Sequence, residues 1–247
     1  MGLFELIQQK RYQEFCNIYE ANEGLKEKGD KFQDLMPGNY LLALLGKGDY
    51  EKAAEVSFRI ISEKGPDRSA STYHMICSVA KMELGQIKEA YEVLYEGRNA
   101  AYQDLSRTEI GNLLYYEAVM TGDEKTRRAG ERLLNSRLKK YKGGLGESTL
   151  ASMEFSIASF IMGGCTEREM LNEIDGFSEN IIRNRYKVRA LFYTAIKNYD
   201  MGDTAKYIKY LQKVDRIYDS CPSVTVEFEY YVAQICLSKC KGHSEKD

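Results

Sequence analysis

The sequence has few of the residues on which enzyme active sites most often depend. It contains two histidines, His74 and His243, among 247 residues, and it has no tryptophan. Histidine is the commonest general acid or base at neutral pH, so its scarcity argues against acid–base catalysis. We interpret His74, which adjoins Met75 and Ile76, as a half-buried helix residue. The sequence therefore predicts that the protein is not an enzyme and uses no cofactor.

Long apolar runs are also missing. The longest purely apolar stretch is a handful of residues, too short to cross a bilayer as a helix, and the N-terminus lacks the pattern of a signal peptide. Six cysteines in a chain without that pattern are typical of a reducing compartment, where thiols stay free. These features predict no contact with membranes and a cytoplasmic location.

Proline is rare, with three residues in the chain, whereas 43% of the residues are hydrophobic. Few prolines leave helices uninterrupted, since each proline removes a backbone donor and ends or kinks a helix. This composition predicts a substantial core built from helices.

A short turn recurs along the whole chain. Gly48 is followed after 37 residues by Gly85 and after 37 more by Gly122, and Gly163 and Gly202 continue the series. Lys10, which lies 38 residues before Gly48, occupies the place of a degenerate first turn. A recurrence of 37 to 41 residues predicts stacked helical hairpins, because one hairpin alone cannot bury its apolar face.

The stretch from 39 to 64, NYLLALLGKGDYEKAAEVSFRIISEK, shows the hairpin most clearly. Its apolar residues after the turn recur at steps of three and four, the spacing of one helix face. LLGKGDYEKAAE and the later MELGQIKEAYEVL resemble the turn and second helix of a tetratricopeptide repeat. The family has a small residue in its first helix, matched by Ser78, Ser156 and Ala195, and an alanine in its second helix, matched by Ala53 and Ala90. Leu41, Tyr115, Arg127, Arg168 and Tyr207 depart from that pattern.

The resemblance implies an all-α fold: a right-handed superhelix of stacked antiparallel helix hairpins, a tetratricopeptide-like α-solenoid that forms one domain over residues 1–247. The final helix, at 222–240, is predicted to be a C-terminal capping helix that covers the last hairpin around Ile208 and Leu211. The predicted hairpins span 1–21, 39–64, 69–99, 106–141, 147–175 and 184–219.

In hairpin stacks of this family the first helix of each pair lines a concave groove. The resemblance therefore implies a set of partner-binding residues on these helices, with Tyr116 and Tyr193 as aromatic anchors and Arg189 as the residue that binds an acidic group. The predicted set consists of Thr72, Met75, Val79, Glu109, Asn112, Tyr116, Arg189, Phe192, Tyr193, Ile196 and Tyr199.

Two local patterns suggest chemistry only superficially. Residues 142–149, KGGLGEST, resemble a phosphate-binding loop, but Glu147 stands where the loop needs a lysine. Cys236, Cys240 and His243 could ligate zinc, but their spacing matches no structural zinc site. We predict that residues 142–149 form an inter-repeat loop and that Cys236, Cys240 and His243 bind no metal.

Positive charge gathers late in the chain. Residues 181–216 carry nine Lys and Arg against three Asp and Glu, although the whole chain has a net charge of −2. A charge run of this kind is usually a solvated helix face, and the alternative is a convex surface that attracts an acidic partner. The low overall charge argues against nucleic acid binding.

The leading functional hypothesis is a non-catalytic module that holds a protein or peptide in its concave groove. One version is a bacterial immunity protein that neutralises a cognate toxin, and the alternative is a peptide-sensing regulatory repeat protein. An enzyme on a helical scaffold or a nucleic-acid binder fits the sequence less well. The oligomeric state is open.

Overall fold

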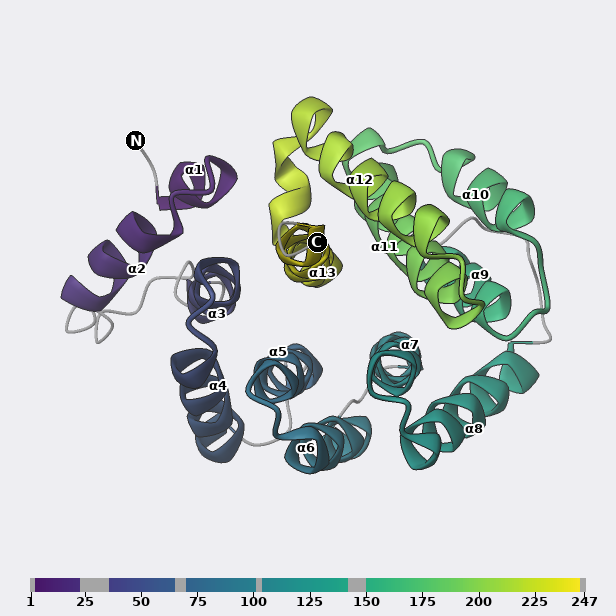
Figure 1. Ribbon diagram of the computed structural model, residues 1–247, viewed down its shortest axis with the longest axis horizontal. Coiled ribbons are helices and arrows are strands. Elements are labelled where there is room, and N and C mark those ends of the chain that lie inside the picture. The colour runs from purple at the N-terminus through teal and green to yellow at the C-terminus, as the bar shows by residue number, and fades with distance from the viewer. Residues whose placement is uncertain (1–2, 23–35, 65–69, 101–103, 142–149, 245–247) are drawn as a thin grey trace.

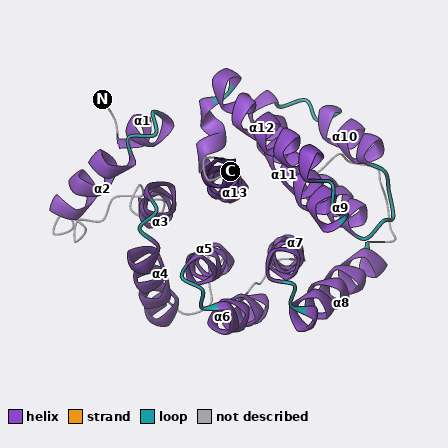
Figure 2. Cartoon of the chain, viewed as in Figure 1, coloured by secondary structure: helices purple, strands orange, loops and turns teal. Residues whose placement is uncertain are grey.

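The computed structural model describes residues 3–22, 36–64, 70–100, 104–141 and 150–244. Thirteen α-helices and one short 3₁₀ helix make up these residues, and no strand occurs among them (Figure 2). The predicted all-α class is confirmed. None of the helices in the described ranges is both long and apolar enough to span a bilayer.

The helices follow one another as six pairs and a final single helix. The pairs are α1 (Leu3–Gln8) with α2 (Tyr12–Ala21), α3 (Met36–Lys47) with α4 (Tyr50–Lys64), α5 (Ala70–Glu83) with α6 (Ile87–Ala100), α7 (Asp104–Thr121) with α8 (Glu124–Lys140), α9 (Leu150–Ile161) with α10 (Glu167–Asp175), and α11 (Asn180–Asp200) with α12 (Thr204–Ser220). The 3₁₀ helix η2 (Pro222–Val226) then precedes α13 (Phe228–Ser244).

The last predicted helix is therefore two elements. Pro222 begins η2, whereas α13 begins six residues later at Phe228. Glu227 separates them because its backbone is extended, with φ −85° and ψ 128°. This break changes the direction of the chain at the entrance to α13.

The six turns inside the pairs have one backbone feature in common. Every positive φ angle among the described residues is at one of the predicted turn positions, with values of 58° at Lys10 and 71–83° at Gly48, Gly85, Gly122, Gly163 and Gly202. Glycine adopts this left-handed conformation without the penalty that a Cβ atom brings. The recurrence in the sequence thus marks the turns, and the turn prediction is confirmed.

The pairs are arranged as an arc (Figure 1). Helices α3, α5, α7 and α11 lie on its inner side, and α4, α6, α8 and α10 lie on its outer side. The two ends of the arc meet, because Lys10 pairs with Asp215 at 3.3 Å and the Tyr218 hydroxyl donates to the Gln8 carbonyl.

Helix α13 lies inside the arc, where it contacts α3 on one side and α11 and α12 on the other (Figure 1). From Phe228 to Leu237 it is apolar on nearly all sides, which is characteristic of a helix segment buried in a core. Its buried apolar residues are Phe228, Tyr230, Tyr231, Val232, Ala233, Ile235, Cys236 and Leu237.

Close helix crossings depend on small residues, as the repeat resemblance implies. In the second of the glycine-turn hairpins the Ser78 hydroxyl reaches the Ala90 carbonyl at 3.0 Å. In the α7–α8 pair, Gly130 takes this role rather than position 115: a Cβ there would lie 3.1 Å from Leu114 Cβ and 3.3 Å from the Gly111 carbonyl oxygen. Gly111 of α7 is also closely packed, since a Cβ there would lie 2.6 Å from Leu134 Cδ2. Both helices of that pair thus have a small residue at the crossing.

Candidate functional site

The residues predicted to line a groove face the interior of the arc, but most of them are covered. Seven of them are buried: Met75, Val79, Asn112, Tyr116, Phe192, Tyr193 and Ile196. Thr72, Glu109 and Arg189 are partly exposed, and Tyr199 is 40% exposed. A partner therefore has no access to the predicted anchors Tyr116 and Tyr193 in this conformation.

Helix α13 packs against one of the two anchors, Tyr116. The Tyr116 hydroxyl lies 3.8 Å from the Cys236 thiol of α13. The Tyr116 ring also contacts the Phe192 ring, with centroids 5.4 Å apart, and Phe192 meets Tyr193 edge-on at 5.0 Å. The aromatic residues on the inner side of the arc thus pack against one another and against the chain's own last helix.

Arg189 lies at the centre of a buried group of charges. Its guanidinium is within 2.6 Å of Glu109 Oε1, 3.0 Å of Glu154 Oε2 and 2.7 Å of Glu227 Oε2, and it is 3.5 Å from Glu229 Oε2. We call these five residues the Arg189 cluster. Among them, Arg189 and Glu109 were both predicted as site residues from the sequence, and the structure brings them together.

Four separate parts of the chain build this cluster. Glu109 comes from α7, Glu154 from α9, and Arg189 from α11, whereas Glu227 and Glu229 flank the start of α13. Asn112 of α7 donates from Nδ2 to Glu154 Oε1 at 2.6 Å, and Arg185, one turn before Arg189, pairs with Glu227. The cluster therefore links the beginning of α13 to three helices of the arc.

The sequence reasoning missed Glu154, Glu227 and Glu229. A usable signal exists for Glu154, because it is the single charged residue in the apolar helix LASMEFSIASFI. A carboxyl group in such a helix needs a buried partner, since an unpaired buried charge is costly. Its partner Arg189 lies 35 residues later, and no local pattern connects the two.

The carboxyl groups of the cluster differ in their affinity for protons. Burial, with nearby carboxylates, raises the pKa of Glu154 to about 8 and that of Glu229 to about 7, although Arg189 acts against both shifts. Burial also acts to raise the pKa of Glu227, but the charges of Arg189 and Arg185 hold it below its usual value. Burial thus favours the protonated form of Glu154, which lowers the excess negative charge of the cluster.

A second buried carboxyl group lies between α5 and α7. Glu117 hydrogen bonds with the hydroxyl of Ser78, which also lies 3.0 Å from the Ala90 carbonyl oxygen. A hydroxyl has one proton and cannot donate to both oxygens, so a protonated Glu117 satisfies this arrangement. Burial raises the pKa of Glu117 to about 8, in agreement with that assignment.

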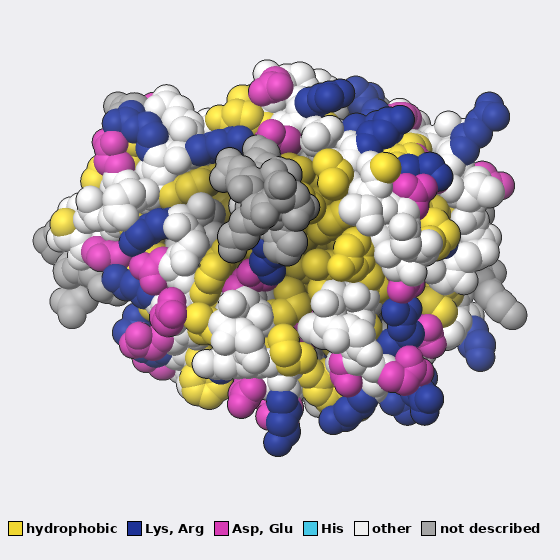
Figure 3. Space-filling model, in the orientation of Figure 1, with side chains coloured by type: hydrophobic (Ala, Val, Ile, Leu, Met, Phe, Trp, Pro, Cys, Tyr) yellow, Lys and Arg dark blue, Asp and Glu magenta, His cyan; other side chains and the backbone are white. Residues whose placement is uncertain are grey.

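The basic run at 181–216 is partly neutralised by contacts within the protein. Arg185 and Arg189 pair with Glu227, Lys187 pairs with Asp175 at 2.7 Å, and Lys206 pairs with Asp203 at 2.8 Å. The remaining outer cations of α12 are Lys209, Lys213 and Arg216. Figure 3 shows positive and negative side chains interspersed around the edge of the face it presents.

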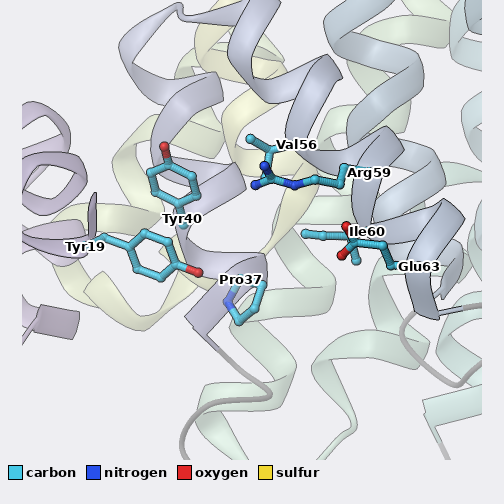
Figure 4. Close-up of a pocket in the computed structure, with 7 residues that line it drawn as sticks. All are labelled: Tyr19, Pro37, Tyr40, Val56, Arg59, Ile60 and Glu63. Carbon is cyan, nitrogen blue, oxygen red and sulfur yellow. The ribbon is translucent and has the colours of Figure 1, made fainter. Parts of the chain in front are cut away.

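A cleft opens on the outside of the molecule between α2, α3 and α4 (Figure 4). It has a volume of about 380 Å³ and an aromatic floor, where the rings of Tyr19 and Tyr40 stack with centroids 4.2 Å apart and planes inclined by 11°. Both tyrosines are buried, whereas Arg59 and Glu63 at the edge are exposed. The residues that line the cleft are Tyr19, Pro37, Tyr40, Val56, Arg59, Ile60 and Glu63.

The stacked tyrosines are held in place by neighbouring charges. The Tyr40 hydroxyl donates to Glu20 Oε1 at 2.8 Å, and the same oxygen pairs with Lys52 Nζ at 2.9 Å. Lys52 and the Tyr40 hydroxyl keep the pKa of Glu20 below its usual value, so Glu20 stays ionised and continues to accept the tyrosine proton. The position of Tyr40 in the floor of the cleft is thus fixed by contacts within the protein.

Neither a scan against protein-family models nor a search of the curated proteins found a match to this chain.

Proposed function

We propose that the protein is a non-catalytic binding module for a protein or peptide partner. In this proposal the helix pairs form a tetratricopeptide-like α-solenoid, and α13 acts as a cap that turns into the solenoid instead of continuing it. The partner binds on the outer surface. The observation that carries the proposal is the open cleft between α2, α3 and α4.

The cleft has the composition of a protein interface. Its floor is formed by buried aromatic rings and its edge by exposed charged residues, and an apolar centre with a polar rim is the usual arrangement in such interfaces. Tyrosine and arginine are also the residues that contribute most to binding energy at interfaces. Tyr19, Tyr40 and Arg59 supply both types at one place.

The inner side of the arc is less suitable for a partner. To reach Tyr116, a partner would have to displace α13 and expose its apolar residues. Six of these are large, and at roughly 1.5–3 kcal/mol for each buried side chain the loss is on the order of 10 kcal/mol. A loss of that size is comparable to the whole stability of a typical domain.

The strongly perturbed carboxyl groups also support a non-catalytic function. Glu117, Glu154 and Glu229 have the raised pKa values that catalytic acids often show. However, each of them is buried and contacts other parts of the protein instead of lining the cleft. Their positions fit a role in joining helices.

Affinity purification followed by reconstitution tests this proposal. The tagged full-length chain, produced in its own cells, should retain one specific protein, and the two purified proteins should form a complex with a micromolar or lower Kd. If the partner is a toxin, co-production of the chain should restore the growth that the toxin prevents. Turnover of the partner or of a small molecule by the purified chain would contradict the proposal.

A further inference from the structure

The residues that line the cleft indicate the chemistry of the group that fits into it. Val56, Ile60 and Glu63 follow one another at steps of four and three along α4, so they lie on one side of that helix and face the tyrosines of α2 and α3 (Figure 4). Pro37 lies at the bottom of the same space. Together these residues form a cavity that opens to solvent and has both apolar and polar groups in its lining.

The volume of the cavity indicates what fits into it. At about 380 Å³ it is at the lower end of the range for pockets that hold small ligands. A cavity of this size on an open surface suits one large side chain better than a complete peptide segment. The apolar part of the lining, which comes from Val56, Ile60 and the tyrosine rings, favours an aromatic or a large aliphatic side chain.

The edge of the cavity carries one positive and one negative group, Arg59 and Glu63. Within the described residues, Arg59 and Glu63 form no ion pair or hydrogen bond, either with each other or with a neighbour. They are four positions apart on α4, or about one helical turn. Two charges of opposite sign, one turn apart, match a segment whose own charges have the reverse order.

We propose that the cleft receives one aromatic or large aliphatic side chain of a protein partner, with an acidic partner residue on Arg59 and a basic one on Glu63. This inference rests on the proposed function and specifies its site. The guanidinium of Arg59 can bind a carboxylate through two parallel hydrogen bonds, which fixes the orientation of the partner segment. Glu63 adds specificity, since a partner with the charges reversed would be repelled at both positions.

Selection of peptides on the immobilised full-length chain provides the test. The probe is a display library of random 12-residue peptides. We expect the enriched peptides to share one large apolar residue with an acidic and a basic residue within about one helical turn of it. Enrichment of peptides without this pattern, or no enrichment over uncoated beads, would overturn the inference.

Charge-swap variants then locate the peptides on the surface. Arg59→Glu and Glu63→Lys should each weaken binding about tenfold or more, because each replaces an attraction by a repulsion. Glu55→Lys on the same helix is the matched control, since Glu55 is exposed and does not line the cleft, and it should leave the Kd unchanged. A peptide with its acidic residue changed to lysine should regain affinity for the Arg59→Glu variant. Peptides that bind all these variants equally lie elsewhere, and the inference would then be wrong.

Binding of the natural partner to these variants distinguishes a failure of this inference from a failure of the proposed function. If the purified partner binds the Arg59→Glu and Glu63→Lys variants with an unchanged Kd, the assignment of the cleft fails while protein binding itself stands. Both variants change exposed side chains, so they should melt like the wild type and remain interpretable.

Discussion

Arg189 donates from Nε to Glu227 Oε2 at 2.7 Å, and Glu227 is the residue that separates η2 from α13. The contact links the fifth glycine-turn hairpin to the start of the helix that fills the arc. The same guanidinium contacts Glu109 of α7 and Glu154 of α9. Arg189 thus holds four parts of the chain together, and its role is structural in this conformation.

Replacement of this arginine should destabilise the protein. Arg189→Ala would leave several buried carboxyl groups without their counter-charge, and breaking a buried ion pair in this way costs about 3–5 kcal/mol. Arg189→Lys should lose less, because it keeps the charge but not the forked geometry. Urea denaturation measures both, with Lys209→Ala as a control on an exposed residue of α12. A midpoint for Arg189→Ala equal to that of the control would contradict the structural role.

Two tyrosines of α11 give a matched comparison of burial. Tyr193 is 1% exposed and Tyr199 is 40% exposed, although both were predicted to contact a partner. Tyr193→Ala should lower the free energy of unfolding by roughly 3 kcal/mol because it leaves a cavity. Tyr199→Ala should cost less than about 1 kcal/mol. Thermal melts distinguish the two, and equal losses would show that Tyr193 is not buried in the folded protein.

Raised carboxyl pKa values predict a loss of stability as the pH increases. Glu117 and Glu154 have pKa values of about 8 in the folded protein and Glu229 about 7, against a reference value of 4.5. Their protonated forms are favoured by folding, so their contribution is fully present below pH 4.5 and is lost as the pH rises through 7 to 8. In that window the unfolded chain binds fewer protons than the folded one, and the free energy of unfolding must fall.

The Glu117→Gln variant isolates one of these groups. Glutamine keeps a hydrogen bond to Ser78 but does not ionise, so the variant should be close to the wild type near pH 5 and lose less stability by pH 8. Each titrating group contributes up to about 1.4 kcal/mol for each pH unit. Urea denaturation at a series of pH values gives the slopes. An unchanged slope in the variant would show that Glu117 is already ionised in the folded protein.

Glycine substitutions test the turns separately from packing. An added Cβ at Gly202 would meet no atom within 4 Å, but φ there is 78°. Gly202→Ala should therefore cost about 1 kcal/mol through backbone strain alone. Gly38 of α3 has equal space and an ordinary φ, so Gly38→Ala should be neutral or stabilising. Thermal melts that show equal losses for both variants would contradict the assignment of the turn.

The turns and helices were predictable because their determinants are local. A glycine with positive φ occurs at five of the six turns, and the residues on both sides have helical spacing. The position of α13 was not predictable in this way. A helix that is apolar on nearly all sides must be buried, but its sequence does not specify whether it covers one hairpin or fills the space between several.

The candidate site was predictable only in part, for the same reason. Arg189 and Glu109 are polar residues on predicted inner helices, and both belong to the cluster. The other partners of Arg189 include Glu154 of α9 and Glu227 at the entrance of α13, which are 35 and 38 residues away in the sequence. The basic run at 181–216 likewise suggests a positively charged surface. The sequence does not show that carboxylates outside the run, such as those of Asp175 and Glu227, lie beside it in the fold. The cleft depends on how α2 lies relative to α4, which no local pattern contains.

The claim that α13 belongs to the folded core, so that partners bind outside the arc, is tested most directly by native-state hydrogen exchange. The amides of Tyr231, Val232 and Cys236 should exchange only through global unfolding, with the same free energy of opening as the buried residues Leu113 on α7 and Leu191 on α11. If the amides of α13 exchange through a separate opening of much lower free energy while those of α7 and α11 stay protected, the account is contradicted. A partner could then bind on the inner side of the arc.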